Sequence, residues 1–184
     1  MLRRLLLLAS IVGFKAWLID RWLAARRGDN APGPLRMLVV VEAPINATWA
    51  VVADIPLQPE WMHEMKRVRL TTPGPVHLGT RGEATVRIAC ISVTDPVEVT
   101  AFEPPTRFAI RHEGRFTGDG LITLEPGADG TTTIVRWDET LVPPLLPDLG
   151  ALVLAPVLRS VFQADLHRLK RLVETGSADD SADD

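Results

Sequence analysis

The sequence predicts an α+β domain in which one long C-terminal α-helix covers a curved antiparallel sheet of about six or seven strands. Between residues 36 and 142, short β-rich segments follow one another and are separated by Gly, Pro or Asp, a spacing typical of an antiparallel meander. After them, residues 147–174 carry apolar side chains at helical spacing. A long amphipathic helix needs an apolar surface to cover, and the curved sheet is the surface that the chain provides.

Composition divides the 184-residue chain into four parts. We interpret residues 1–23 as an N-terminal hydrophobic segment, 24–35 as a linker, 36–175 as the folded domain and 176–184 as a disordered acidic tail. Hydrophobic residues form 46% of the chain and charged residues 23%, which suits a protein that closes one core.

The N-terminal segment has an apolar run that is interrupted by charges. A membrane-spanning helix needs about 20 apolar residues, and Lys15, Asp20 and Arg21 fall within that window. Lys15 costs about 3 kcal/mol at mid-membrane, and each Leu, Ile or Phe around it returns only about 0.3 to 0.6 kcal/mol. The long Lys15 stem can carry its charge toward the interface. We therefore expect residues 5–23 to form a single membrane anchor, on a side of the membrane that the sequence does not fix. A helix lying in the interface, a cleaved signal and a packing helix are the alternatives.

The folded domain opens with a β-branched stretch, residues 36–43, which predicts a strand that ends before Pro44. Asn46 or Thr48 can then cap a short helix. The next stretch, residues 53–70, holds two prolines and then crowds Trp, Met and His side chains together. This composition favours either the rim of a cavity or packing beneath a loop.

The remainder of the domain predicts a run of strands and a final helix. Asp129 and Gly130 supply a hairpin turn between the last two strands. Asp148 is placed to cap the helix, and Pro156 should kink it because proline lacks an amide donor. The predicted strands after the opening one are residues 67–72, 81–93, 96–103, 106–113, 116–125 and 131–142. The apolar face of the helix comprises Leu158, Val161, Phe162, Leu166, Leu169, Leu172 and Val173.

Charge and cysteine content narrow the classes of function. The net charge of -3 gives no reason to expect a nucleic-acid partner. Cys90 is the single cysteine, so an intrachain disulfide or a thiolate metal cluster cannot form. The four histidines lack the spacing of metal ligands, and we expect neither a metal site nor a cofactor. The oligomeric state is not indicated.

Several segments together resemble the START-like helix-grip superfamily, and within it the polyketide cyclase/dehydrase (SRPBCC) branch of small bacterial proteins. They are "VEAPINATWAVVADIPLQPEW", "PGPVHLGTRGEATV", "AFEPPTRFAIRHEGRFTGDGLITLEP", "GTTTIVRWDETL" and "FQADLHRLKRLVE". The resemblance covers residues 36–174 and implies a cavity between the sheet and the long helix, because members of the superfamily bind or transform many different apolar molecules. It also implies that Trp61 walls the entrance of the cavity and that Met62 or Met65 lines it.

Strand alternation and the apolar face of the helix extend the expected lining. The alternative for Trp61 is that it packs in the core beneath the short helices. The full set of candidate ligand-binding residues is Trp61, Met62, Met65, Ile88, Cys90, Phe108, Ile110, Val135, Trp137, Leu158 and Phe162.

His112 and Glu139 are the candidate catalytic residues. His112 shares a strand face with Phe108 and Ile110, and Glu139 shares one with Val135 and Trp137. A buried glutamate beside a neutral histidine can act as an acid–base pair, which cyclisation and aldol dehydration need to remove a proton next to a carbonyl. A slip of one residue in register would turn either side chain outward.

The leading interpretation is a membrane-tethered protein that binds a hydrophobic small molecule, such as a lipid, an isoprenoid or a polyketide-like compound. The sequence leaves open whether the protein is an enzyme. The first alternative is a cyclase or dehydratase, a lyase or isomerase that uses His112 and Glu139. The second is an interaction module with a closed core.

Overall fold

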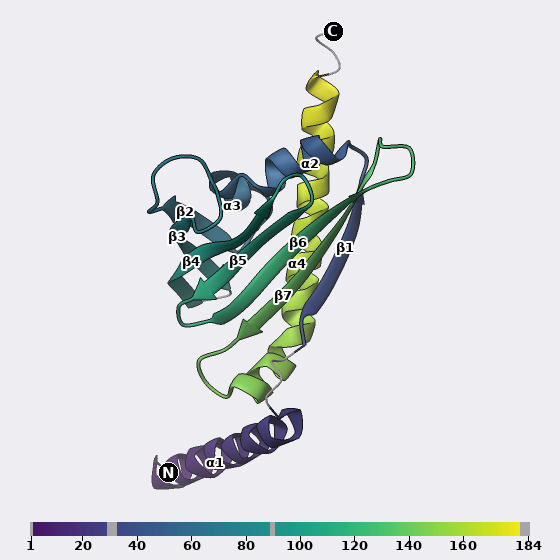
Figure 1. Ribbon diagram of the computed structural model, residues 1–184. Coiled ribbons are helices and arrows are strands. Elements are labelled where there is room, and N and C mark those ends of the chain that lie inside the picture. Colours follow the sequence, from purple (N-terminus) through teal and green to yellow (C-terminus); the bar gives the residue numbers. More distant parts are fainter. Residues whose placement is uncertain (1, 29–32, 89–90, 181–184) are drawn as a thin grey trace.

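A computed structural model describes residues 2–28, 33–88 and 91–180, with side chains described for residues 10–28, 33–87 and 92–176 (Figure 1). Its elements, in chain order, are α1 (Leu2–Arg27), β1 (Leu35–Val41), α2 (Ile45–Val52), the 3-10 helix η1 (Ile55–Leu57), α3 (Gln58–Trp61), β2 (Met65–Leu70), β3 (Arg81–Ile88), β4 (Ile91–Glu103), β5 (Arg107–Glu113), β6 (Thr117–Pro126), β7 (Thr133–Val142) and α4 (Pro147–Asp180).

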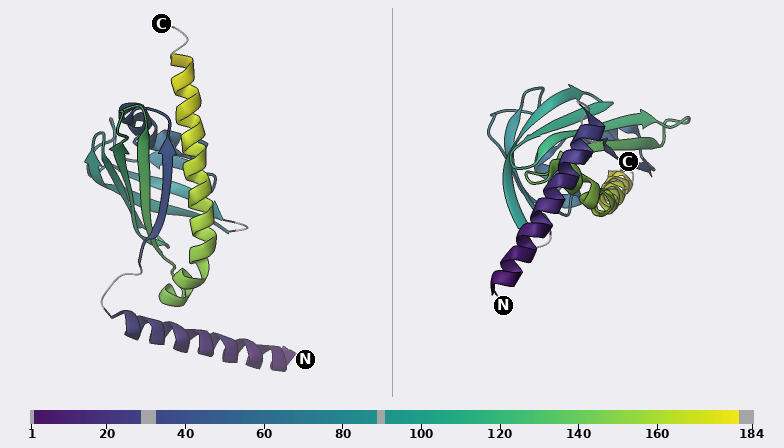
Figure 2. Two further views of the ribbon diagram at one scale, coloured as in Figure 1. Left: turned by 90° about the vertical axis from the view of Figure 1, so that its right-hand side faces the viewer. Right: turned by 90° about the horizontal axis from the view of Figure 1, so that it is seen from below.

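The seven strands form one antiparallel sheet in the order β1-β7-β6-β5-β4-β3-β2. Strands β2 to β7 follow one another as a meander, and the first strand pairs with the last, for example Met37 with Trp137. The sheet is curved, and α4 lies along its concave side (Figure 2). This arrangement confirms the predicted α+β architecture of a helix-grip type.

The apolar face of α4 is the one that the sequence predicts. Leu158, Phe162, Leu166, Leu169 and Val173 are buried, whereas Val161 and Leu172 are half-buried. Pro156 lies inside the helix, and the first turns of α4 diverge from the axis of the rest (Figure 2). The divergence is the expected effect of a proline, which removes one hydrogen bond and clashes with the preceding turn.

The hairpin between β3 and β4 differs from the prediction. We expected a break near Asp95, but β4 runs without interruption from Ile91 to Glu103 and includes Pro96. Strand β5 pairs with β4 only from Val97 onward, so on that side Pro96 faces no partner strand. A proline, which has no amide to donate, fits at such a position.

Two predicted helix caps are also wrong. Asn46 and Thr48 lie inside α2, whose N-cap is Pro44, and no side chain caps it. At α4, Asp148 belongs to the first turn, and the cap comes from another helix: one carboxylate oxygen of Asp20 accepts the backbone N–H groups of Asp148 and Leu149, both at 2.9 Å. The first amides of a helix have no partner within it and carry a partial positive charge, so a carboxylate is favourable there.

The helices at both ends extend past their predicted boundaries. α1 continues to Arg27, which forms an ion pair with Asp148, so part of the predicted linker is helical and is tied to α4. α4 runs to Asp180, past the predicted end of the domain at residue 175, because the helix keeps adding backbone hydrogen bonds beyond its buried face. The last residues of the predicted tail, 181–184, lie outside the described residues.

By length and composition, one helix among the described residues could cross a membrane, and it is Pro147–Gly176. Its apolar face packs against the sheet, as the core helix of a domain does. The anchor expected for residues 5–23 is not identified in the described part of α1, where Lys15, Asp20 and Arg21 interrupt the apolar run. The side chains of residues 1–9 lie outside the described residues.

Candidate ligand-binding site

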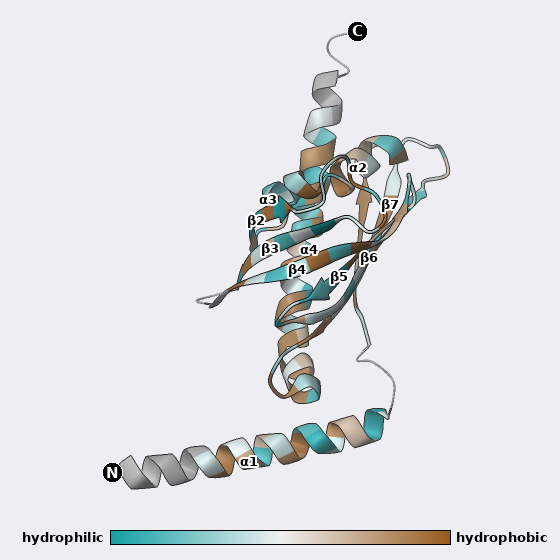
Figure 3. Ribbon diagram, turned by 60° about the vertical axis from the view of Figure 1, so that its left-hand side comes forward, coloured by the Kyte–Doolittle hydropathy of each residue, from teal (hydrophilic) through white to brown (hydrophobic). Residues whose placement is uncertain are grey.

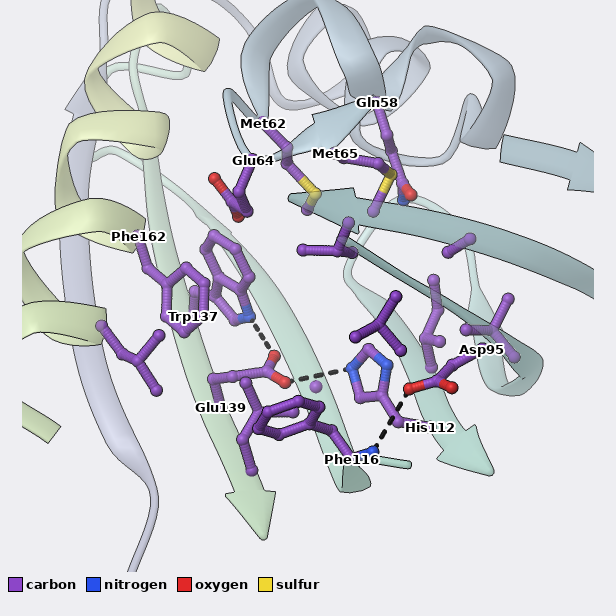
Figure 4. Close-up of a pocket in the computed structure, with 18 of the residues that line it drawn as sticks. Gln58, Met62, Glu64, Met65, Asp95, His112, Phe116, Trp137, Glu139 and Phe162 are labelled. Carbon is purple, nitrogen blue, oxygen red and sulfur yellow. Dashed lines mark hydrogen bonds and ion pairs between the residues drawn. The ribbon is translucent and has the colours of Figure 1, made fainter. Parts of the chain in front are cut away.

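A cavity of about 240 Å³ lies between the inner face of the sheet and the first half of α4 (Figure 4). Helix α3 and the chain that follows it close one end. Alternate residues of each strand face the same side of a sheet, so β3 to β7 each contribute every second side chain to the wall. The cavity is open space inside the domain, which does not fit the alternative of a closed core.

Most of the expected lining residues lie at this wall, which is mainly apolar. Those from α3, the strands and α4 that line the cavity are Met62, Met65, Phe108, Ile110, Trp137, Leu158 and Phe162. Ile88 and Cys90 were also expected there, but the side chain of Ile88 and the whole of Cys90 lie outside the described residues.

Trp61 and Val135 lie behind the wall, not in it. Both are fully buried, and neither lines the cavity. The Trp61 ring packs edge-on against Trp137, with 6.0 Å between the ring centroids. Trp61 therefore holds Trp137 in place from the core side, which is the packing alternative that the sequence left open.

The structure adds lining residues that sequence reasoning missed. The alternation of apolar residues in β3 and β4 could have indicated Ala84, Val86, Val93 and Val97. Gln58 and Glu64 gave no such signal, because polar residues beside a short helix usually face solvent. The further lining residues are Gln58, Glu64, Ala84, Val86, Val93, Asp95, Val97, Phe116, Gly120, Ile122, Leu141, Leu154 and Val157.

The register of β5 and β7 brings His112 and Glu139 together inside the cavity (Figure 4). Both strands pair with β6, and His112 Nε2 lies 3.1 Å from Glu139 Oε1. The other carboxylate oxygen accepts a hydrogen bond from Trp137 Nε1 at 2.8 Å. Glu139 is thus a buried carboxylate that has a hydrogen-bond partner at each oxygen.

Gly120 makes room for this carboxylate. It lies opposite Glu139 on β6, and a Cβ atom at Gly120 would be 2.4 Å from Glu139 Oε2. A glycine inside a strand often marks such a close approach. The neighbouring Gly118 has a φ of +144°, and it lies close to the backbone oxygen of Thr140. Both glycines of this strand thus allow a close approach that a side chain would block.

The charge state of His112 is set by opposing effects. Burial lowers the pKa of the imidazole, but the hydrogen bond to Glu139 and the charges of Glu139, Asp119 and Asp95 outweigh burial and raise it above its ordinary value. The protonated form, paired with the Glu139 carboxylate, is favoured more than in water. The direction of this shift does not favour the neutral histidine that the sequence analysis expected.

Asp95 also fixes the end of the strand that carries His112. Its carboxylate accepts the backbone N–H groups of Arg115 at 2.9 Å and Phe116 at 3.2 Å, in the turn between β5 and β6. A Cβ atom at Gly114 would collide with Asp95, so glycine is required there as well. Asp95 thus holds the turn at the end of β5 that carries His112.

A second polar cluster lies at the other end of the cavity, where α3 approaches α4 (Figure 4). Burial and a hydrogen bond to the carboxyl group of Asp165 raise the pKa of Glu64 to about 8. Asp165 is fully buried, forms an ion pair with Arg168 and accepts the backbone N–H of His63 at 3.1 Å. At neutral pH, Glu64 is thus mainly protonated.

We call the most exposed part of the cavity lining its mouth, and it lies on the first turns of α4. Of the described lining residues, Leu154 and Val157 are the exposed ones, and Val157 is 57% exposed. A ligand entering the cavity would therefore pass these two side chains, close to the point where Asp20 of α1 caps the helix.

The comparison with family models gives one match: the polyketide cyclase / dehydrase and lipid transport family, over residues 35–174. The chain belongs to this family. The resemblance found in the sequence is thereby confirmed. The comparison with curated proteins finds no match.

Solved structures that resemble this family member cover most of its chain. A protein from Deinococcus radiodurans has 26% sequence identity and a TM-score of 0.60, and the match covers 79% of this chain and 99% of that one. A protein from Thermus thermophilus has 16% identity and a TM-score of 0.64, covering 78% and 99%. The Zhui aromatase/cyclase from a Streptomyces species has 18% identity and a TM-score of 0.59, covering 77% and 93%. The last two similarities show the fold alone.

For a member of the polyketide cyclase / dehydrase and lipid transport family, this cavity offers acid–base groups and no obvious metal site. Among the residues that the structure describes, no group of three or more His, Cys, Asp and Glu side chains is arranged to hold a metal ion. The His112 imidazolium can donate a proton or a hydrogen bond, and Glu139 can accept one. The remaining wall can hold apolar surface.

Proposed function

We propose that the protein binds a mainly apolar small molecule, such as an isoprenoid, a single-chain lipid or a polyketide-like compound, in the cavity between the sheet and α4. The observation that carries this proposal is the wall itself. It is apolar over most of its area and has buried polar groups at two ends, the usual composition of a small-molecule pocket.

The size of the cavity supports a compact ligand. Pockets that enclose drug-sized molecules measure roughly 300 to 1,000 Å³, and this cavity measures about 240 Å³. A two-chain phospholipid would not fit without a large displacement of α4, whereas a small ring system or a short isoprenoid would.

The first experiment is native mass spectrometry of the full chain, purified from the membrane fraction of its host and compared with a denatured sample. We expect a co-purifying neutral compound of defined mass, released on denaturation. The protein should also bind the neutral apolar dye N-phenyl-1-naphthylamine, and the released compound should displace it. Protein that is empty and takes up no dye would contradict ligand binding.

A membrane surface is the proposed source of the ligand, and α1 would hold the cavity mouth against it. Its residue Asp20 caps α4, and Arg27 pairs with Asp148, so the end of α1 is fixed beside the mouth. α1 lies across the end of the domain at which α4 begins, at a steep angle to α4 (Figures 1 and 2). A helix fixed in this way is suited to lie along the bilayer surface, which favours the interfacial alternative for residues 5–23 over a spanning anchor.

Many exposed side chains of α1 and of the first turns of α4 are apolar, as Figure 3 shows by hydropathy. Cationic side chains lie among them, including Lys15 and Arg21, and the Arg26 guanidinium stacks over the Trp22 ring at 3.9 Å from its centroid. Tryptophan and cations beside apolar residues are typical of helices bound to anionic membranes. The exposed apolar residues of α1, of the loop before α4 and of the first turns of α4 are Ile11, Val12, Phe14, Trp17, Leu18, Ile19, Trp22, Leu145, Leu152, Val153, Leu154 and Val157.

Catalysis of the cyclase or dehydratase type is the second candidate function. The observation that favours it is that His112 and Glu139 form a hydrogen-bonded pair within the cavity. The test is to incubate the released compound with fresh protein and follow its mass. Loss of water or a shift in retention that His112→Gln abolishes would establish the enzyme; unchanged compound with unchanged affinity would establish the carrier.

A further inference from the structure

We propose that the Gln58 side chain forms a second polar subsite, which hydrogen-bonds a neutral carbonyl, ether or hydroxyl oxygen of the ligand. This inference rests on the proposed ligand binding and adds a chemical requirement to it. The subsite lies at the end of the cavity away from the His112–Glu139 pair (Figure 4).

The position of Gln58 is unusual for an amide side chain. The residue is 1% exposed and lines the cavity, and among the described residues its Nε2 atom has no hydrogen-bond partner. Its backbone is fixed, because the carbonyl oxygen of Gln58 accepts the Met62 N–H at 2.8 Å in α3. Figure 4 shows the amide end directed toward the cavity, next to Met65.

A buried amide that lacks a partner lowers the stability of a protein, because it has lost its hydrogen bonds to water. Leucine or methionine would suit the packing of this apolar wall better. The polar Gln58 side chain is therefore best explained by a hydrogen-bond partner that the ligand supplies. The Nε2 amide of Gln58 can donate to a ligand oxygen, which would supply the hydrogen bond that the described residues leave unmade.

The neighbouring groups restrict that acceptor to a neutral one. Glu64 lines the same end of the cavity, and burial beside Asp165 raises its pKa to about 8. No lysine or arginine lines the cavity among the described residues, and the Arg168 guanidinium is already paired with Asp165, so a ligand carboxylate or phosphate would be buried without a cationic partner. At this end a ligand cation would meet the mainly protonated Glu64 in place of a free carboxylate. A neutral oxygen satisfies both conditions.

The test uses two neutral competitors of nearly the same shape, 2-acetylnaphthalene and 2-isopropylnaphthalene, which displace N-phenyl-1-naphthylamine from the full chain. We expect the ketone to bind more tightly than the hydrocarbon. Gln58→Leu should reduce that preference by roughly tenfold, the effect of one hydrogen bond, and leave the affinity for the hydrocarbon the same or higher. Glu60→Gln, at an exposed residue of the same helix that does not line the cavity, should keep the preference.

Thermal unfolding separates a binding role from a structural one. If Gln58 serves the ligand, the melting temperature of Gln58→Leu equals or exceeds that of the wild type, because an unsatisfied buried amide has been removed. A lower melting temperature, or equal ketone preference in wild type and variant, would overturn the subsite alone. Failure of the wild type to bind the dye or either naphthalene would overturn the proposed function, and the subsite with it.

Discussion

His112 Nε2 lies 3.1 Å from Glu139 Oε1, although the two residues come from strands that are separated by β6. The glycine between them explains how: Gly120 of β6 has no side chain, so the pair meets over its backbone. Trp137, on the same strand as Glu139, donates to the second carboxylate oxygen and is itself packed against Trp61 and Phe162. An acid–base pair in an apolar cavity is thus positioned by core packing.

The substitution Glu139→Gln should remove the increase in the pKa of His112 that the folded protein causes. The Glu139 charge is among the causes that outweigh burial, so without it we expect the pKa of His112 to fall, toward or below its ordinary value of 6.5. The wild-type pKa is raised, so the stability that this pair contributes is present below about pH 6.5 and is lost as pH rises through the raised value. The stability of Glu139→Gln should not show this decrease as pH rises.

The measurement for Glu139→Gln is an NMR titration of the histidine ring protons, together with urea unfolding at several pH values. The exposed His167 on α4 is the internal control for this measurement. If the His112 signal titrates alike in wild type and variant, the ion pair is not what sets its charge.

Gly120→Ala tests the close approach. The added methyl group would lie 2.4 Å from Glu139 Oε2 and would push the carboxylate away from Trp137. We expect the free energy of unfolding to fall by about 1 to 3 kcal/mol, as overpacking usually costs, and the Trp137 environment to change in near-UV circular dichroism. In Gly176→Ala, the new methyl group meets nothing within 4 Å, so this helical variant should be no less stable than the wild type. Equal stability of both variants would show that the carboxylate can move freely.

The sequence could indicate the architecture and the inward direction of His112 and Glu139, because strand alternation and helical periodicity are local signals. It could not indicate the cluster of Gln58, Glu64 and Asp165. Asp165 is separated from Glu64 by about half of the chain, and its burial depends on how α4 docks on α3. The cap of α4 by Asp20 was hidden for the same reason, since the acceptor comes from a different helix.

In Glu64→Gln, the free energy of unfolding should depend less on pH than in the wild type. Its folded-state pKa of about 8 lies above the ordinary 4.5, so the folded state holds the proton more tightly than the unfolded state does. The resulting stability is fully present below about pH 4.5 and is lost as pH rises toward 8, at up to about 1.4 kcal/mol for each pH unit. Glutamine, a neutral substitute for the protonated acid, removes this loss.

Chemical denaturation of Glu64→Gln between pH 4.5 and 8 is the measurement. The curve of unfolding free energy against pH should be flatter than that of the wild type, with the variant more stable at the alkaline end. Glu60→Gln changes an exposed carboxylate of α3, the short helix just before Glu64, and should follow the wild type. Parallel curves for Glu64→Gln and wild type would mean that Glu64 stays ionised in the folded protein.

The double variant Leu152→Ser and Val153→Ser tests the membrane surface at the cavity mouth. Both side chains are more than 60% exposed on the first turns of α4, so their replacement should not disturb the core. If they enter a bilayer, losing them should weaken binding of the full chain to vesicles of phosphatidylcholine and phosphatidylglycerol by roughly tenfold, as measured by co-sedimentation. Leu78→Ser, at a residue that is 63% exposed in the loop between β2 and β3, is the matched control and should bind as the wild type does. Equal loss in both variants would indicate nonspecific adsorption, and no loss in either would mean that this end of α4 does not touch the membrane.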